Sequence, residues 1–123
     1  MIHRDADVVV FLDRSPLIHG HVLVVPMEHV ETLDDLPDNL VRPVFATVRR
    51  ASIAVQKALR SEGSFVATNT RVSQSVAHLH VHVVPRNKGD GLFSTRLSWQ
   101  RRKYESDSEM AQIATKIRTA YAG

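Results

Sequence analysis

Three of the seven histidines occur within five consecutive positions, in the segment AHLHVHVV (77–84). One apolar residue separates each histidine from the next, and this period of two is typical of a β-strand. Successive side chains on a strand point to opposite faces, so we expect His78, His80 and His82 to share one face while the residues between them pack into the core. The sequence therefore predicts a row of imidazole rings on one face of a strand.

Such a row allows three interpretations. The rings could simply coat the solvent face of a strand, although three in register make this a poor explanation. They could bind a metal ion, but the first and third rings are about 13 Å apart on a strand that rises about 3.3 Å per residue, so they do not converge on one ion. A metal site would need ligands from a second segment, for which Asp13 and His21 are the candidates.

Covalent catalysis at phosphorus is the third interpretation, and the row favours it. A neutral imidazole is a competent nucleophile near pH 7 and needs no strong base to activate it. Rings on either side of a central nucleophile can donate hydrogen bonds to phosphate oxygens and to a leaving oxygen. The chemistry that best suits this spacing is therefore covalent catalysis of phosphoryl transfer.

The elements that must position these rings follow from hydrophobic periodicity. Helix 41–59 is expected to begin close to Pro43 and to end at Gly63, and Ser106 or Ser108 is the expected N-cap of the last helix. The predicted strands are 7–13, 21–26, 64–70 and 76–84, and the predicted helices are 41–59 and 106–122. Because this order lacks βαβ alternation, we expect an antiparallel α+β fold in a single domain spanning residues 1–123.

Composition limits the function classes. The chain has no cysteine, which excludes disulfides, thiolate catalysis and cysteine-based zinc sites. Its 123 residues contain no apolar run long enough to span a membrane and no signal-peptide layout at the N-terminus, so we expect a cytoplasmic protein. The net charge of +3 is compatible with an anionic small ligand and is weak support for nucleic-acid binding.

The segment HLHVHVV (78–84) resembles the motif of the histidine-triad (HIT) superfamily of nucleotide hydrolases and transferases. Three further segments are similar to that family in the same order: FLDRSPLIHGHVLVVPMEHV (11–30), QSV (74–76) and VPRNKGD (84–90). The resemblance covers nearly the whole chain and is closer to the fragile-histidine-triad branch. It implies an antiparallel sheet with one long central helix and a C-terminal helix.

The resemblance also implies which residues act on the substrate. His80 would be the nucleophile that forms a nucleotidyl-histidine, His78 and His82 would contact phosphate, and His21 would support them from the neighbouring strand. Asp13 would hold the ribose hydroxyls. The residues that we expect to bind the nucleotide are Asp13, Gln74, Ser75, Ser73, Phe11 and Arg86.

Two positions depart from the family pattern. Ser73 stands where the family usually has a glycine, which narrows the backbone freedom beside a phosphate. Ala67 replaces an amide residue, unless Asn69 substitutes through a shifted turn. Both departures put phosphate and ribose recognition in question.

The function that we expect is cleavage at the α-phosphorus of a nucleoside 5′-phosphate derivative. A dinucleoside polyphosphate is the favoured substrate because the stretch 86–103 carries six basic residues against one acid, Asp90, and begins where the histidine strand ends. Phe93 and Trp99 in this stretch could stack on a second base. The alternatives are a nucleoside phosphoramidase, a purine-nucleotide-binding module with little turnover, and a metallohydrolase.

The same reasoning sets the expected partners. We expect no required cofactor, apart from a divalent cation such as Mg²⁺ that accompanies a polyphosphate substrate. The ligand would be a purine nucleotide or dinucleotide, with no nucleic-acid or membrane partner. A homodimer is expected, partly from the resemblance and partly because few strands and one long helix leave an edge strand and apolar helix surface to be covered.

Overall fold

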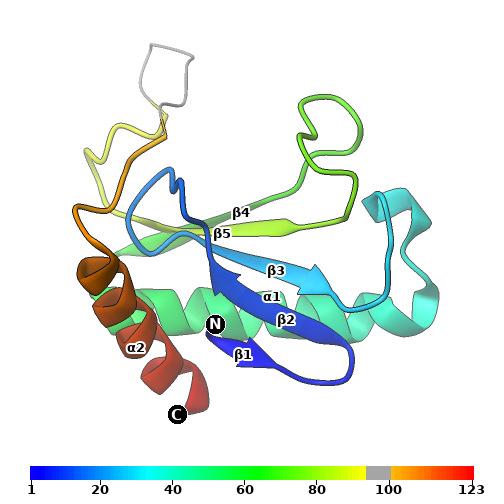
Figure 1. Cartoon of the computed structure of the whole chain (residues 1–123), viewed down its shortest axis with the longest axis horizontal. Helices are drawn as coiled ribbons and strands as arrows, with labels where there is room; N and C mark the ends of the chain where they lie inside the picture. Colours follow the sequence, from blue (N-terminus) through cyan, green and yellow to red (C-terminus); the bar gives the residue numbers. More distant parts are fainter. Residues whose placement is uncertain (94–100) are drawn as a thin grey trace.

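The computed structural model describes residues 1–93 and 101–123, and these residues form a five-stranded antiparallel sheet with two α-helices (Figure 1). The strand order is β1-β2-β3-β5-β4. The elements are β1 (His3–Arg4), β2 (Val8–Leu12), β3 (Val22–Pro26), a short 3₁₀ turn (Leu33–Asp35), α1 (Asp38–Leu59), β4 (Gly63–Ala67), β5 (Val81–Arg86) and α2 (Asp107–Ala122). The predicted α+β class and its two helices are thus confirmed, whereas the two-residue strand β1 was not foreseen.

Strands β2 and β3 form the predicted antiparallel hairpin, and their side chains alternate between the two faces of the sheet. Phe11 lies opposite Leu23, and Leu23 lies opposite His82 of β5. These residues alternate with fully buried valines such as Val10 and Val22, which belong to the main core. One face of the sheet therefore packs against the helices, while the other keeps a line of partly accessible side chains.

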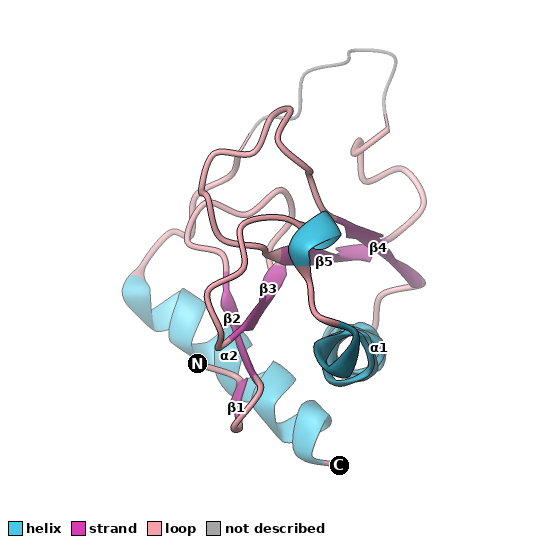
Figure 2. Cartoon of the chain, turned by 90° about the vertical axis from the view of Figure 1, so that its right-hand side faces the viewer, coloured by secondary structure: helices cyan, strands magenta, loops and turns pink. Residues whose placement is uncertain are grey.

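Helix α1 covers the core face of the sheet, and α2 packs against one end of α1 (Figures 1 and 2). The buried residues Val48, Ala51 and Val55 of α1 join Ile117 of α2 in a single cluster with the inward-facing valines of the sheet. Ser106 is the N-cap of α2, and its hydroxyl accepts a hydrogen bond from the Glu109 N–H at 3.0 Å. None of the helices in the described residues is both long and apolar enough to cross a membrane.

The ends of α1 differ from the prediction. The helix begins at Asp38, so Pro43 lies in its second turn and removes only one hydrogen bond close to the N-terminus. At the other end, Arg60 takes the left-handed conformation that closes the helix, with φ of 52°. Gly63, the predicted stop, is instead the first residue of β4.

The histidine strand is shorter than the sequence predicts, because β5 begins at Val81 and not at residue 76. Pairing between β3 and β5 ends at Val24 and Val81 because the next ladder position on β3 would need an N–H from Pro26, which proline lacks. His80 lies just outside the strand, where the Thr68 hydroxyl donates to its carbonyl oxygen at 2.8 Å. Only His82 of the three rings sits within the sheet.

Candidate active site

A cavity of about 460 Å³ lies on the sheet face opposite α1, and the three histidines of the row line it together. The shortened strand therefore does not disperse them: the rings of His80 and His82 are 5.1 Å apart in an edge-on arrangement. The floor consists of the outward-facing residues of the sheet. The lining residues are Phe11, Asp13, Ser15, Leu23, Val25, Ser75, Val76, His78, His80, His82 and Arg101.

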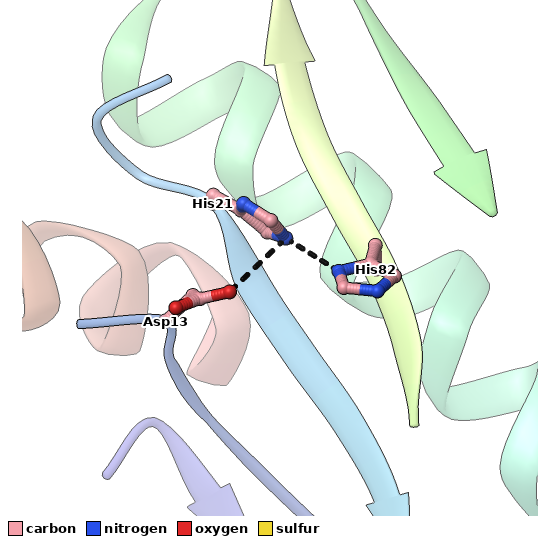
Figure 3. A group of neighbouring side chains, drawn as sticks. All are labelled: Asp13, His21 and His82. Atoms are coloured by element: carbon pink, nitrogen blue, oxygen red, sulfur yellow. Dashed lines mark hydrogen bonds and ion pairs between the residues drawn. The ribbon is translucent and has the colours of Figure 1, made fainter. Parts of the chain in front are cut away.

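A chain of hydrogen bonds fixes the tautomers of His21 and His82 (Figure 3). The buried Leu17 N–H donates to Nδ1 of His21 at 3.0 Å, so the proton of the neutral His21 ring sits on Nε2. That N–H donates to Nδ1 of His82 at 2.8 Å. His82 must then carry its own proton on Nε2, at the end of the ring that points away from His21.

Burial keeps this pair uncharged. Loss of solvent lowers the pKa of His21 from its ordinary value of 6.5 to about 3, with smaller opposing and reinforcing effects from Asp13 and from the cationic forms of its neighbours. Desolvation likewise lowers the pKa of His82 to about 4. At neutral pH, His82 is therefore a neutral hydrogen-bond donor and not an imidazolium acid.

The other two rings are oriented by backbone carbonyls. The Nδ1–H of His80 donates to the His78 carbonyl oxygen at 2.8 Å, because a carbonyl can only accept. This assignment leaves Nε2 of the neutral His80 ring without a proton and free to act as a nucleophile. His78 in turn donates from Nε2 to the Pro26 carbonyl oxygen at 3.0 Å, and the ring of His29 meets it edge-on at 5.1 Å.

The rim of the cavity carries opposite charges. Asp13, directly after β2, accepts a hydrogen bond from the Ser15 N–H at 2.9 Å and lies 3.8 Å from Nε2 of His21. Nη1 of Arg101 donates to the Asp13 carboxylate at 3.1 Å and to the Ser15 carbonyl oxygen at 2.9 Å. The Asp13 carboxylate therefore links the buried histidine pair to a partly exposed guanidinium.

Three of the predicted nucleotide-binding residues lie outside the cavity lining. The Gln74 side chain folds back onto its own loop, accepting from the Arg71 N–H and donating to the Glu31 carbonyl oxygen. Ser73 has a φ of 62°, in the left-handed region that favours glycine, and glycine is the residue that the family pattern has at this position. Arg86 makes a two-pronged ion pair with Asp90 at 2.6 and 3.0 Å, and this pair lowers the pKa of Asp90 to about 2.

Reasoning from the sequence missed several lining residues. Leu23 and Val25 carried a usable signal, since they alternate with the buried residues of β3. Arg101 was expected only as one of the six basic residues of the stretch 86–103 and was not singled out, because its cluster looks like solvated surface and its partner Asp13 is 88 positions away. Of the predicted basic stretch, residues 94–100, which include Arg96 and Trp99, lie outside the described residues.

Asp13, His21 and His82 form the one group in the described residues whose ligand atoms lie close enough to hold a metal ion, within 4.8 Å of one another. The tautomers do not fit that role. A metal bound through Nε2 of His21 would move the ring proton to Nδ1, where it would face the Leu17 N–H. The group is better explained as a hydrogen-bonded support for His82.

Comparison with protein families gives a match to the HIT domain over residues 1–89. The chain is 30% identical over 119 residues to the adenylylsulfatase HINT3 of Arabidopsis thaliana, covering 95% of this chain and 60% of the plant protein. It is 34% identical over 82 residues to a bis(5′-nucleosyl)-tetraphosphatase of Schizosaccharomyces pombe, covering 65% of this chain and 45% of the yeast protein. The chain thus spans about three-fifths or less of the length of these two relatives.

Solved structures agree with the assigned fold. A HIT-like protein of Bartonella henselae superposes with a TM-score of 0.83 at 30% identity, covering 97% of this chain and 84% of that one. A zinc-bound histidine-triad protein of Mycobacterium smegmatis gives 0.81 at 31% identity, covering 98% and 82%. Both similarities extend past residue 89, so they include the C-terminal helix.

Proposed function

Because the chain belongs to the HIT family, we propose that it is a nucleotide hydrolase or transferase that cleaves at the α-phosphorus of a nucleoside 5′-phosphate derivative. The observation that carries this proposal is the pair of tautomers in the cavity. Nε2 of His80 has a lone pair available, and Nε2 of His82 presents an N–H beside it. A nucleophile next to a hydrogen-bond donor is what attack on a phosphoryl group requires.

In the proposed reaction, the Nε2 lone pair of His80 forms a bond to the α-phosphorus. The bond from phosphorus to the leaving group breaks, and its electron pair departs with the leaving group. The phosphorylated ring is cationic, and the His78 carbonyl oxygen stabilises it by accepting the Nδ1–H. Water then attacks phosphorus, and the P–N electron pair returns to Nε2. One proton of the water stays on the new phosphate oxygen of the nucleoside monophosphate, and the other is released to solvent.

Three other residues of the cavity assist in this scheme. The His82 N–H would donate to a non-bridging oxygen, whose negative charge grows during the attack. Ser75 lines the same cavity, and its hydroxyl could donate to the leaving oxygen. Asp13 at the rim would accept from the ribose hydroxyls.

A dinucleoside polyphosphate is the substrate class that we favour. An amine leaving group must take up a proton, whereas a nucleoside polyphosphate leaves as a stable anion. Because burial lowers the pKa of His82 to about 4, this ring is a weak proton donor at neutral pH, which suits the anionic leaving group. The name of the yeast relative, a bis(5′-nucleosyl)-tetraphosphatase, agrees with this preference.

A nucleotide-binding module with little turnover is the second candidate function. Ala67 lies opposite His82 in the β4–β5 register and offers only a methyl group where the family pattern has an amide.

One panel of substrates tests these functions: diadenosine polyphosphates, an adenosine phosphoramidate and adenylylated peptides, assayed for released AMP with and without a chelator. Release of AMP from the polyphosphates supports the enzyme, and AMP binding without turnover on any substrate supports the module. Loss of activity with the chelator, restored by zinc, would favour the metallohydrolase.

We also propose that a second copy of the chain is the partner of this protein. Strand β4 is an edge of the sheet, and its Val66 side chain is exposed. Val41 and Phe45 of α1 are exposed on the same stripe as Ser52, whose hydroxyl lies 2.6 Å from that of Ser64 in β4. A two-fold partner could cover these exposed apolar side chains, and analytical ultracentrifugation at micromolar concentration would show a dimer.

The remaining expectations concern surroundings. A cytoplasmic location and the absence of a required cofactor stay proposals, with Mg²⁺ entering only as the counter-ion of a polyphosphate substrate. Fractionation of cells that produce the protein would test the location. Turnover of a substrate with an uncharged leaving group, measured after Mg²⁺ is removed, would test the cofactor. Activity that survives this removal would mean that no metal cofactor is required.

A further inference from the structure

Arg101 stands out on the cavity rim because it comes from a part of the chain far from the other lining residues. Its side chain is 47% exposed, whereas that of its partner Asp13 is 16% exposed. Within the described residues, both of its hydrogen bonds leave from Nη1, to Asp13 and to the Ser15 carbonyl oxygen. A guanidinium has five N–H groups, and within the part of the chain that the structure describes those on Nη2 and Nε are not used, so they can donate to an anion in the cavity.

The segment 101–104, which we call the strap, holds Arg101 in this place. The Arg102 N–H donates to the Pro16 carbonyl oxygen at 2.7 Å. The Tyr104 hydroxyl accepts from the Gly20 N–H at 3.0 Å, and its ring stacks on His19 at 4.5 Å. The backbone of the strap is bound along the loop that leads into His21, and the Arg101 side chain is bound to Asp13 and Ser15. Both sets of contacts therefore position Arg101.

The distribution of charge among the lining residues explains why the position of Arg101 matters. Burial keeps His21 and His82 uncharged at neutral pH, so this pair offers hydrogen bonds and no positive charge. Among the described residues that line the cavity, Arg101 has the one guanidinium or ammonium group, and Asp13 has the one carboxylate. A substrate with several phosphates brings more negative charge than the α-phosphate alone, and Arg101 is the group available to balance it.

We propose that Arg101 is a specificity-determining residue that selects nucleotides carrying negative charge beyond the α-phosphate. This inference rests on the function proposed above and assigns the choice of leaving group to the strap. The Asp13–Arg101 ion pair is partly exposed and therefore weak, so the guanidinium can turn from Asp13 toward a β-phosphate at low cost. That movement also frees the Asp13 carboxylate to accept from a ribose.

The test compares two neighbouring substitutions on two substrates. Arg101→Gln removes the charge at the rim, and Arg102→Gln removes a charge whose side chain reaches the Asp90 carbonyl oxygen, away from the cavity. We expect Arg101→Gln to lower kcat/KM for diadenosine triphosphate about tenfold and to change kcat/KM for adenosine 5′-phosphoramidate less than twofold. Arg102→Gln should leave the ratio of the two kcat/KM values as it is in the wild type. Arg101→Lys should keep part of the wild-type preference that Arg101→Gln loses.

A merely structural role for Arg101 would lower kcat/KM for both substrates alike, and this result would overturn the proposal, as would an unchanged ratio. Binding separates this failure from failure of the proposed function. If the wild type releases no AMP from any substrate, the affinity ratio of ADP to AMP, measured by calorimetry, still tests Arg101. A ratio that falls in Arg101→Gln supports the selection of extra charge, and a ratio equal to that of the wild type contradicts it.

Discussion

Two regions of the cavity are built in opposite ways: the back wall, by which we mean the hydrogen-bonded pair His21 and His82, and the rim, by which we mean Asp13 and Arg101. On the back wall, His21 is fully buried, and both of its ring nitrogens have hydrogen-bond partners within the protein. On the rim, Arg101 is about half exposed, and its ion pair with Asp13 is partly exposed. The first region works through neutral hydrogen bonds in a dry environment, and the second works through full charges close to water.

This difference separates two tasks that a nucleotide-cleaving site must perform. Buried neutral hydrogen bonds are little affected by salt and fix the orientation of a ring, so the back wall suits the positioning of His82 beside the nucleophile. Exposed charges are screened and mobile, so the rim suits selection among substrates. Changes to the nucleophile and the back wall should therefore have large effects on all substrates, and changes to the rim should have small, selective ones.

The largest effect is expected at His80, which stands between the two regions. His80→Gln keeps a polar side chain of similar reach but removes the Nε2 lone pair, so kcat should fall by about 10³-fold or more for every substrate. Affinity for AMP should change less than about threefold, because Asp13 and His82 remain. Single-turnover assays and calorimetry measure the two quantities. A variant that kept a tenth of the wild-type kcat would show that His80 is not the nucleophile.

A smaller but general loss is expected when the back wall is broken. His21→Leu leaves the Leu17 N–H and Nδ1 of His82 without partners, so we expect the free energy of unfolding to drop by about 2–4 kcal/mol. We also expect kcat to fall about 10–100-fold on polyphosphates and phosphoramidates alike, because His82 loses its fixed tautomer. Urea unfolding and initial rates are the measurements.

The matched control for His21→Leu is His19→Leu, a change to the neighbouring histidine that stacks on Tyr104 at the surface. It removes a hydrogen bond to the Lys103 carbonyl oxygen but touches neither ring of the buried pair. We expect it to cost less than about 1 kcal/mol of stability. Because His19 also contacts the strap, the two variants are compared on the phosphoramidate, and equal losses of kcat on that substrate would mean that the back wall has no special role.

Stability should depend on pH through the same pair. The pKa of His21 is lowered to about 3 and that of His82 to about 4, so between these values and 6.5 the unfolded chain binds protons that the folded chain does not. Folding stability is therefore fully present above pH 6.5 and is lost as the pH falls toward 4, by up to about 1.4 kcal/mol per pH unit for each ring. Unfolding curves at pH 7.5 and 5.0 measure this slope.

The variant His21→Gln sharpens the pH test, because it removes one of the two titrating rings. Its stability should fall less steeply between pH 6.5 and 4 than that of the wild type. The charges that face the pair, from Asp13 and Arg101, are present in both proteins and affect both slopes alike. Parallel slopes in the two proteins would show that the buried pair does not control the acid side of the stability curve.

The sequence predicts the back wall better than the rim, and the reason is locality. The alternation of His78, His80 and His82 is visible in five residues and predicts three rings on one side of the chain; in the structure all three line one cavity, although only His82 lies within the strand. The strand boundary was wrong because it depends on Pro26, a residue of another strand that stops the ladder. Arg101 reaches the cavity only because the strap binds the loop before His21, and no local pattern encodes a contact over that separation.

The predicted loop residues show a related limit. The match of Gln74 to the family motif gives its place in the loop but not the direction of its side chain, which bonds Glu31 and the loop backbone. Arg86 was chosen for its charge, yet Asp90 is four positions away and holds it in a close ion pair. Charge and position are readable from the sequence, whereas the competition between partners is settled only when the chain is folded.

The smallest effect is expected at Ser73, which takes a left-handed backbone conformation but does not line the cavity. Ser73→Gly relieves the crowding of Cβ at φ of 62°, which favours the folded state, while the added freedom of glycine in the unfolded chain offsets part of that gain. The net result should be about 0.5 kcal/mol of added stability with KM unchanged within twofold.

Ser73→Ala is the matched control, because it also removes the hydroxyl but keeps Cβ, and it should be less stable than the glycine variant. The Asn69 side chain bonds the Ser73 carbonyl oxygen, a backbone contact that all three proteins retain. Urea unfolding at constant m-value ranks the three proteins, and a glycine variant less stable than the alanine variant would mean that this turn holds no strain. A change of KM in Ser73→Gly would place the loop on the rim, where charge and backbone shape would then select substrates together.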